Sequence, residues 1–213
     1  MSGPLPVLRE DGDILLCVKP VGISSEDGMP RLLCQQQGLQ ELFCVHRLDT
    51  AVGGVMVYAK TRAAAAALSG QIARRGMEKT YLAVCAGCPA ESEGVMRDLL
   101  FKDSRSNRSF VVKRMRRGVK EAELSYRVLQ STAEKSASLV RVTLLTGRSH
   151  QIRVQFASRQ MPLYGDGRYG SREKGCTVAL WSHALAFVHP GSGEYVRAVV
   201  PPPAAWPWNL FNQ

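Results

Sequence analysis

One stretch decides how the rest of the chain is interpreted: Val45-His46-Arg47-Leu48-Asp49-Thr50-Ala51-Val52-Gly53-Gly54-Val55-Met56-Val57-Tyr58-Ala59-Lys60. It begins with a polar loop that holds one carboxylate, Asp49, and it continues through two glycines into an apolar run. Two adjacent glycines allow a tight turn that side chains would obstruct. The run from Val55 is rich in β-forming residues and predicts a buried strand. A carboxylate on a short loop before a rigid strand is a candidate catalytic group, although an ion pair of Arg47 with Asp49 would explain the pattern equally well.

The composition is that of a globular protein with a polyanionic partner. The chain has 213 residues, of which 45% are hydrophobic and 22% are charged, which suits one domain with a proper core. We find no apolar stretch long enough to cross a bilayer and no secretory signal at the N-terminus, so the expected location is the cytoplasm. The net charge of +10 favours nucleic acid as the partner, and we expect a monomer.

The positive charge is concentrated in residues 102–120. This segment has eight Lys or Arg and one Asp, which gives it a charge of +7, and Phe101, Phe110 and Met115 are interleaved with it. Basic residues with occasional aromatics suit an RNA backbone with unstacked bases nearby, whereas the competing interpretation is a solvated basic hairpin. The candidate RNA-binding residues, here and elsewhere in the chain, are His46, Arg47, Lys102, Arg105, Arg108, Lys113, Arg114, Arg116, Arg117 and Arg148.

The six cysteines do not predict a metal site. Cys85 and Cys88 have C-x-x-C spacing, but the second pair that a structural zinc site needs is missing, because Cys34 and Cys44 are ten residues apart. Cys85 also lies in an apolar, strand-like run, where cysteine behaves as a small hydrophobic residue. We therefore expect reduced, structural cysteines.

The local patterns predict alternating strands and helices. Residues 1–10 are expected to form a loose lead-in. A strand over 13–19 is stopped by Pro20 and Gly22, a short helix over 30–37 is stopped by Gly38, and Thr61 caps a helix that ends at Gly76. Further strands are predicted over 77–85, 121–129 and 138–145.

A final helix is predicted in the stretch Thr146-Gly147-Arg148-Ser149-His150-Gln151-Ile152-Arg153-Val154, where it follows a turn at Gly147. Ser149 is placed to cap it, and Ile152 and Phe156 are four residues apart and should face the core. Arg148 and Arg153 flank this apolar face, so both can face a neighbouring cleft.

Three of these stretches together resemble the RluA-type pseudouridine synthases. His46-Arg47-Leu48-Asp49 is similar to the central motif of that family, Lys79-Thr80-Tyr81-Leu82-Ala83 to its Lys-x-Tyr-x-Ala motif, and residues 146–154 to its Thr-Gly-Arg-x-His-Gln-Ile-Arg-Val motif. The resemblance extends over roughly residues 13 to 208 in the expected order, through Pro162, Gly165-Asp166 and His189-Pro190. It departs from the family at Val52-Gly53-Gly54, where Thr-Ser-Gly is usual.

The resemblance implies an α+β fold, with a mixed, mostly antiparallel sheet, flanking helices and a central basic catalytic cleft. It implies one catalytic domain over residues 1–213, without a separate S4-like RNA-binding module, and an RNA substrate, ribosomal or transfer. The implied catalytic residues are Asp49, Tyr81 and Arg153, and neither a metal nor another cofactor is expected. In the family the Asp is catalytic and the last Arg pairs with it, while the Tyr lies against the target base.

Two further interpretations stay open at this point. A catalytically inactive RNA-binding or ribosome-assembly protein could keep the same fold, and the departure at Val52 and Gly53 would support it. A metal-dependent hydrolase could use His46, Asp49, His150 and Asp166, although no tight pair of ligands appears in the sequence.

Overall fold

We describe the protein from a computed structural model, which covers residues 3–211. The chain divides into two compact units, and each is described by itself. The first comprises residues 1–79 and 181–202, and the second comprises residues 80–180 and 203–213. No helix within the described residues combines the length and apolarity that crossing a membrane requires.

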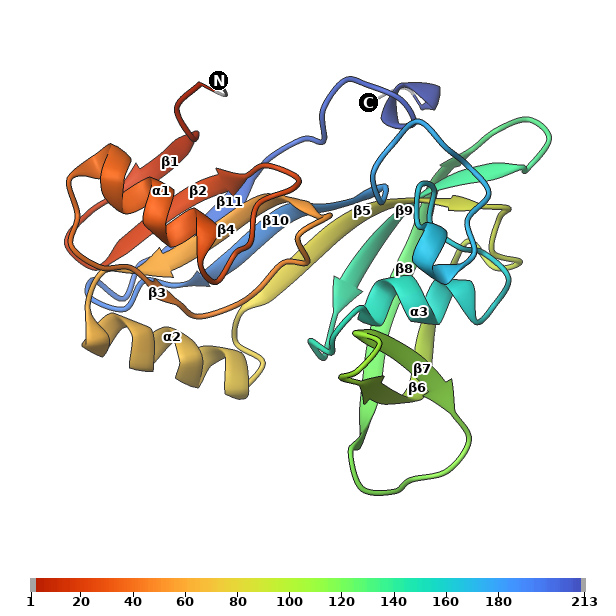
Figure 1. Ribbon diagram of the computed structural model, residues 1–213, viewed down its shortest axis with the longest axis horizontal. Helices are drawn as coiled ribbons and strands as arrows, with labels where there is room; N and C mark the ends of the chain where they lie inside the picture. Colours follow the sequence, from red (N-terminus) through yellow and green to blue (C-terminus); the bar gives the residue numbers. More distant parts are fainter. Residues whose placement is uncertain (1–2, 212–213) are drawn as a thin grey trace. The chain divides into compact units, whose positions relative to one another are not determined.

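The first unit is a small sheet with a helix on each face (Figure 1). Its strands run in the order β1-β2-β4-β10, with β3 beside β4 and β11 beside β10. β10 pairs with β4 in parallel, and the other pairs in this unit are antiparallel. The elements are β1 (Val7–Glu10), β2 (Ile14–Lys19), α1 (Gly28–Gln37), β3 (Phe43–Cys44), β4 (Gly53–Ala59), α2 (Arg62–Ala73), β10 (Leu180–Val188) and β11 (Tyr195–Val199).

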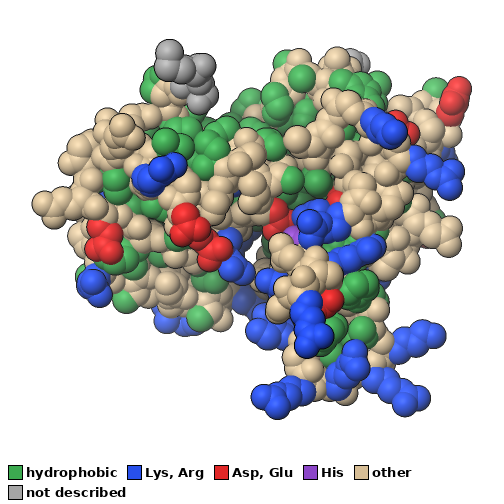
Figure 2. Space-filling view, viewed as in Figure 1, with side chains coloured by type: hydrophobic (Ala, Val, Ile, Leu, Met, Phe, Trp, Pro, Cys, Tyr) green, Lys and Arg blue, Asp and Glu red, His purple; other side chains and the backbone are tan. Residues whose placement is uncertain are grey.

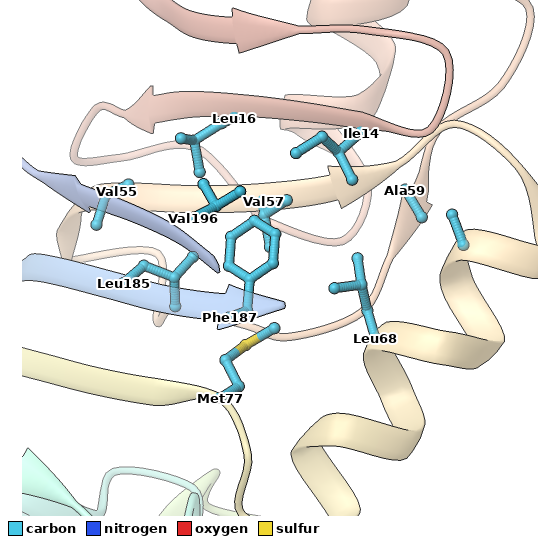
Figure 3. Close-up of a cluster of buried hydrophobic side chains, with 11 residues drawn as sticks. Ile14, Leu16, Val55, Val57, Ala59, Leu68, Met77, Leu185, Phe187 and Val196 are labelled. Carbon is cyan, nitrogen blue, oxygen red and sulfur yellow. The ribbon is translucent and has the colours of Figure 1, made fainter. Parts of the chain in front are cut away.

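The core of this unit lies between the sheet and α2 (Figure 3). Alternate residues of β2 and β4, such as Ile14 and Val57, meet Phe187 of β10 and Leu68 of α2. The intervening residues of both strands are buried as well, and the hydroxyl of Tyr58 donates to the Ser25 carbonyl (2.8 Å) just before α1. A sheet covered on both faces reads as a continuous apolar run, which explains the composition of β4.

Most of the predicted boundaries in this unit are confirmed. Thr61 Oγ1 accepts the Ala64 amide (3.0 Å) and caps α2, and Gly38 ends α1 in a left-handed conformation with φ of 67°. Residues 7–10 are not the loose lead-in that we expected, because they form β1 on the edge of β2. Leu8 and Glu10 belong to an alternating pattern of exposure that a half-buried edge strand produces.

The second unit is an antiparallel sheet in the order β5-β9-β8-β6-β7, with α3 packed against it. Leu100 of β6 and Ala122 of β8 pack against Val154 of α3 and Tyr169. Ile152 and Phe156 are buried, as predicted. The elements are β5 (Glu78–Ala86), β6 (Glu93–Asp103), β7 (Arg108–Val112), β8 (Val119–Ser131), β9 (Ala137–Leu144), α3 (Gln151–Ala157) and the 3-10 turns η1 (Gly167–Tyr169) and η2 (Trp208–Leu210).

The fold class is therefore confirmed as α+β, with a mixed and mostly antiparallel set of strands. All six cysteines are free, and burial raises the pKa of both Cys17 and Cys85 to about 12, which makes these two thiols inert. The central cleft and the single catalytic domain stay predictions.

Candidate active site

Asp49 lies on the turn between β3 and β4 of the first unit and is half-buried. Its carbonyl accepts the Val52 amide (2.9 Å), which closes the turn, and the Thr50 carbonyl accepts the Gly22 amide (2.8 Å) from the segment after β2. The residue before Asp49 is held as well, because the buried Ser25 hydroxyl donates to the Leu48 carbonyl (3.0 Å) and accepts the Leu48 amide (3.3 Å). The carboxylate thus stands on a backbone that is fixed on both sides.

Lys19, at the end of β2, lies beside this turn, and it was not among the candidate site residues of the sequence analysis. Its side chain is fully buried, and Nζ donates to the carbonyls of Pro20 (2.9 Å) and Thr50 (3.4 Å). Burial lowers the pKa of Lys19 to about 8, and the negative charge of Asp49 opposes that shift. The available signal was a lysine that ends an apolar strand directly before a proline.

His46 is a buried residue behind the turn. Its Nε2 accepts the Val57 amide of β4 (3.1 Å), and its role as an RNA-binding residue stays a prediction. Burial, helped by the positive charge of Lys79, lowers the pKa of His46 to about 3, so this side chain is neutral throughout the physiological range.

Arg47 is on the surface of the same turn. Its guanidinium forms an ion pair with Glu26 (3.2 Å), and more than half of each side chain is exposed. Exposed pairs of this kind contribute about 0–1 kcal/mol and break easily, so Arg47 is available to an incoming polyanion.

Arg153 and Asp166 form a buried ion pair in the second unit. Nε and a terminal nitrogen of Arg153 each donate to one carboxylate oxygen of Asp166, at 2.7 Å and 2.8 Å, and both side chains are at most 6% exposed. The guanidinium also lies over the ring of Tyr169 at 5.2 Å. The predicted pairing of Arg153 with Asp49 stays a prediction.

The start of α3 is tied to β7 by a chain of hydrogen bonds. The Ser109 amide donates to the Tyr169 hydroxyl (2.8 Å), which lies 2.9 Å from Nδ1 of His150, and the Ser109 hydroxyl donates to the Ser149 carbonyl (2.7 Å). Ser149 is not the helix cap that we expected. The side chain of Gln151 accepts the Arg148 amide (2.9 Å) instead, since His150 adopts a left-handed conformation (φ 54°) that moves the helix start by one residue.

The remaining predicted residues of the second unit lie on strands and their connections. Tyr81 is a buried residue of β5, where it pairs with Val142 of β9. Arg148 is half-buried and donates from Nε to the Glu121 carbonyl (2.8 Å). Arg108 is also half-buried, and its guanidinium lies over the rings of Phe110 (5.4 Å) and Tyr169 (5.2 Å).

The basic segment 102–120 is exposed. It covers the end of β6, all of β7 and the connection to β8, and Figure 2 shows Lys and Arg side chains gathered over this hairpin with few acidic ones among them. Phe110 and Met115 within it are 40% and 57% exposed. The segment offers cations together with apolar side chains, and seven of its basic residues are exposed: Lys102, Arg105, Lys113, Arg114, Arg116, Arg117 and Lys120.

The side chains of the alternative metal site are engaged elsewhere. His46 accepts a backbone amide, and Asp166 is occupied by Arg153 on both oxygens. Within residues 3–211, the group whose geometry could hold an ion is Asp11, Asp13 and His189. His189 Nδ1 accepts the amides of Gly191 and Ser192, and its Nε2 lies 3.1 Å from Asp11, which accounts for this histidine as a structural link.

Comparisons with known proteins agree on one family. The family model described as RNA pseudouridylate synthase matches residues 13–158. An uncharacterized RNA pseudouridine synthase of Bacillus subtilis, YhcT, is 35% identical over 95% of this chain and 70% of its own length. The ribosomal large subunit pseudouridine synthase C of Escherichia coli is 34% identical over 92% of this chain, which spans 66% of that relative.

Two solved human structures share the fold. The structure named RNA pseudouridylate synthase domain containing 1 superposes with a TM-score of 0.80 at 24% identity, over 94% of this chain and 84% of its own. The structure named RNA pseudouridylate synthase domain containing 4 superposes with a TM-score of 0.77 at 24% identity, over 93% of this chain and 88% of its own. The residues that the family model matches, 13–158, include the Asp49 turn, Tyr81 and α3, the helix that carries Arg153. The chain belongs to the RluA-type RNA pseudouridine synthases, a family of isomerases that act on uridine in RNA.

Proposed function

We propose that this protein converts uridine in RNA to pseudouridine and that Asp49 is the catalytic carboxylate. The observation that carries the proposal is the setting of Asp49: a half-exposed carboxylate on a turn whose backbone is fixed by Ser25, Gly22 and Val52, with the buried ammonium of Lys19 within electrostatic reach. A reaction that needs a carboxylate held in one place beside a cation fits this arrangement.

The reaction breaks the N-glycosidic bond, turns the bound base and forms a carbon–carbon bond between C1′ and C5. The proton on C5 is then lost and N1 takes up a proton, so the product is an isomer of uridine. Cleavage builds positive character on the sugar, which a carboxylate can stabilise electrostatically or by bonding to that carbon. Removal of the 2′ proton by the same carboxylate, to give a glycal, is the alternative route. Both routes need a carboxylate at position 49, and the positive charge of Lys19 lies within electrostatic reach of it.

Tyr81 and Arg47 have supporting roles in this proposal. The target base must leave its stack before its glycosidic bond and C5 edge can be reached. The phenol of Tyr81 would stack on the extruded base. We do not assign it the proton transfer from C5, because a phenol is a poor base at neutral pH. The exposed guanidinium of Arg47, one residue from Leu48 and two from Asp49, would occupy the space that the base vacates.

The exposed basic segment 102–120 is our proposal for the surface that selects the RNA. Its seven exposed cations would contact phosphates, and its exposed Phe110 would stack on an unpaired base. Because the E. coli relative is named for the large ribosomal subunit, large-subunit ribosomal RNA is the first substrate to test, and transfer RNA is the second.

The decisive experiment compares the wild-type protein with Asp49→Asn. Pseudouridine is mapped by carbodiimide labelling across total RNA from cells without this gene and from the same cells complemented with either version. We expect one or a few sites to vanish on deletion and to return only with the wild type, while Asp49→Asn binds RNA within a few-fold of the wild type. Sites restored by Asp49→Asn would exclude Asp49 as the catalytic group.

If no pseudouridine site changes on deletion while ribosome profiles do, the protein acts as an RNA-binding protein on the same fold.

A second measurement tests the basic segment separately from catalysis. Replacing Arg114, Arg116 and Arg117 together by Ala should weaken RNA binding and reduce the slope of log K against log salt by about 2–3, since each lost phosphate contact removes roughly 0.7–0.9. An unchanged slope would place the RNA elsewhere. Arg74→Ala with Arg75→Ala, on the end of α2, is a control that removes exposed charge outside the segment.

A further inference from the structure

The junction between the Asp49 turn and the sheet is built from two glycines. The Val52 amide closes the turn on the Asp49 carbonyl, and β4 begins with the next residue, Gly53. Gly53 pairs with Trp181, and Gly54 with Ser182, where β4 and β10 run in parallel. A displacement of Gly53 or Gly54 would therefore move the adjacent turn that carries Asp49.

Gly53 is enclosed by the indole ring of Trp181. A Cβ at position 53 would lie 2.4 Å from Cζ3 of Trp181, 3.0 Å from its Cε3 and 3.1 Å from the Lys19 carbonyl oxygen. Non-bonded carbons approach to about 3.5–4.0 Å, so a side chain here would have to move the ring or the strand by about 1 Å. The six-membered part of the indole thus occupies the volume that a side chain at position 53 would need.

Gly54 is enclosed in a different way. A Cβ at this position would lie 2.3 Å from the carbonyl oxygen and 2.6 Å from the amide nitrogen of Ser182, and Gly54 also has a φ of 120°. Both obstacles are backbone atoms, and no substitution in a neighbouring side chain could remove them. The two glycines therefore differ: the two nearest obstacles at position 53 are atoms of the Trp181 side chain, whereas the obstacles at position 54 are main-chain atoms of Ser182.

The indole ring is itself fixed. Trp181 Nε1 donates to the Val200 carbonyl (3.0 Å), and the Val200 amide donates to the His183 carbonyl (2.8 Å), which ties the segment after β11 to β10. On the side of Gly53 next to β2, the main chain of Lys19 is close, and the side chain of Lys19 reaches the Thr50 carbonyl. Gly53 is held between a fixed ring and a strand that also binds the turn.

We propose that Trp181 is a positioning residue for Asp49: its ring, seated on Gly53, sets where β4 begins and so where the turn places the carboxylate. This inference rests on the proposed function of Asp49. It also gives the departure from Thr-Ser-Gly at positions 52–54 a physical meaning, because the ring of Trp181 leaves no room for a side chain at position 53.

The test is a double-mutant cycle on Gly53→Ala and Trp181→Ala, with single-turnover rates at saturating RNA and RNA dissociation constants measured for each protein. We expect Gly53→Ala to lower the rate at least tenfold, because misplacing a reacting group by about 1 Å can cost up to ~100-fold. RNA affinity should stay within threefold. The double variant should react at least fivefold faster than Gly53→Ala alone. Both the double variant and Gly53→Ala should remain slower than the wild type.

Gly54→Ala is the matched control, since Trp181→Ala should give it no recovery. The proposal is overturned if the double variant is no faster than Gly53→Ala, or if Gly54→Ala recovers equally. Should Gly53→Ala fail to fold, Trp181→Ala alone decides: a lower rate at unchanged RNA affinity supports the proposal, and a wild-type rate overturns it. Thermal unfolding of every variant shows whether a rate loss follows only the folded fraction. An active wild type with an inactive Asp49→Asn and an additive cycle would remove this inference and leave the proposed function standing.

Discussion

Among the residues that the structure describes, each of the two units buries a cationic side chain, Lys19 in the first and Arg153 in the second, and their surroundings differ. In the first unit, Lys19 has two backbone carbonyls as hydrogen-bond partners and Asp49 within electrostatic reach, and burial lowers its pKa to about 8. In the second unit, Arg153 donates twice to the carboxylate of Asp166, and both are buried. An arginine cannot lose its proton in a protein, whereas a lysine can.

The difference indicates which part of the site responds to pH. The charge of Arg153 does not change with pH, and two hydrogen bonds join it to the carboxylate of Asp166. Lys19 loses its positive charge in the mildly alkaline range, and the electrostatic potential at Asp49 then becomes less positive. The following substitutions separate the two behaviours.

The largest effect is expected from Asp166→Ala. It leaves the guanidinium of Arg153 buried and without the carboxylate that accepts its two hydrogen bonds, which typically costs 3–5 kcal/mol. Urea unfolding at pH 7 measures the loss. Glu93→Ala is the control, because it removes the partner of Arg127 in a pair that is more than 60% exposed on both sides and should change stability by less than 1 kcal/mol. A loss below 1 kcal/mol for Asp166→Ala would show that the pair is not a matched one.

The sequence predicted the elements that depend on short-range patterns. The apolar run of β4 and the Thr61 cap could be read directly, since periodicity and capping are local properties. The family resemblance supplied Asp49, Tyr81 and Arg153, which composition alone would have left as an ordinary loop acid, strand tyrosine and helix arginine.

The settings of three other residues depend on packing between distant segments and could not be predicted from the sequence. His46 reads as an exposed loop histidine until β4 is placed over it, and Lys19 reads as the polar end of a strand until the Asp49 turn covers its ammonium group. The role of Trp181 needs the parallel register of β10 on β4, which joins residues more than 120 positions apart. No local pattern contains that information.

An intermediate effect, with opposite signs for stability and rate, is expected from the titration of Lys19. Its pKa in the folded state, about 8, lies below the value of about 10.4 in an unfolded chain, so between these values the unfolded state binds more protons. Stability should therefore rise by on the order of 2 kcal/mol between pH 8 and pH 9.5. The single-turnover rate should fall over the same range, since Asp49 loses a neighbouring positive charge.

Lys19→Met should abolish both trends. The free energy of unfolding of Lys19→Met should change less with pH above pH 8 than that of the wild type. Its single-turnover rate should be at least tenfold lower at pH 7 and should not fall between pH 8 and pH 9.5. Lys174→Met, which removes an exposed lysine from a loop of the second unit, should retain the wild-type slopes. If Lys19→Met kept the alkaline fall in rate, another group would be responsible for it.

The smallest effect concerns the second buried titratable group behind the turn. The pKa of His46 is lowered to about 3 by burial and by Lys79, against about 6.5 in an unfolded chain. Below pH 6.5 the unfolded state binds the additional proton, so stability falls as the pH is lowered, by about 1 kcal/mol at pH 5.5. Above pH 6.5 His46 contributes no slope.

His46→Gln removes this titration while it keeps an acceptor that can reach the Val57 amide. Difference curves of unfolding free energy, wild type minus variant, should be level from pH 8 to pH 6.5 and then decline toward pH 5. A difference curve that rises with acidification would mean that His46 is stabilised as a cation, as Arg153 is by Asp166. In that case the first unit would also hold its buried charge through a matched partner, and the contrast between the two units would reduce to Lys19 alone.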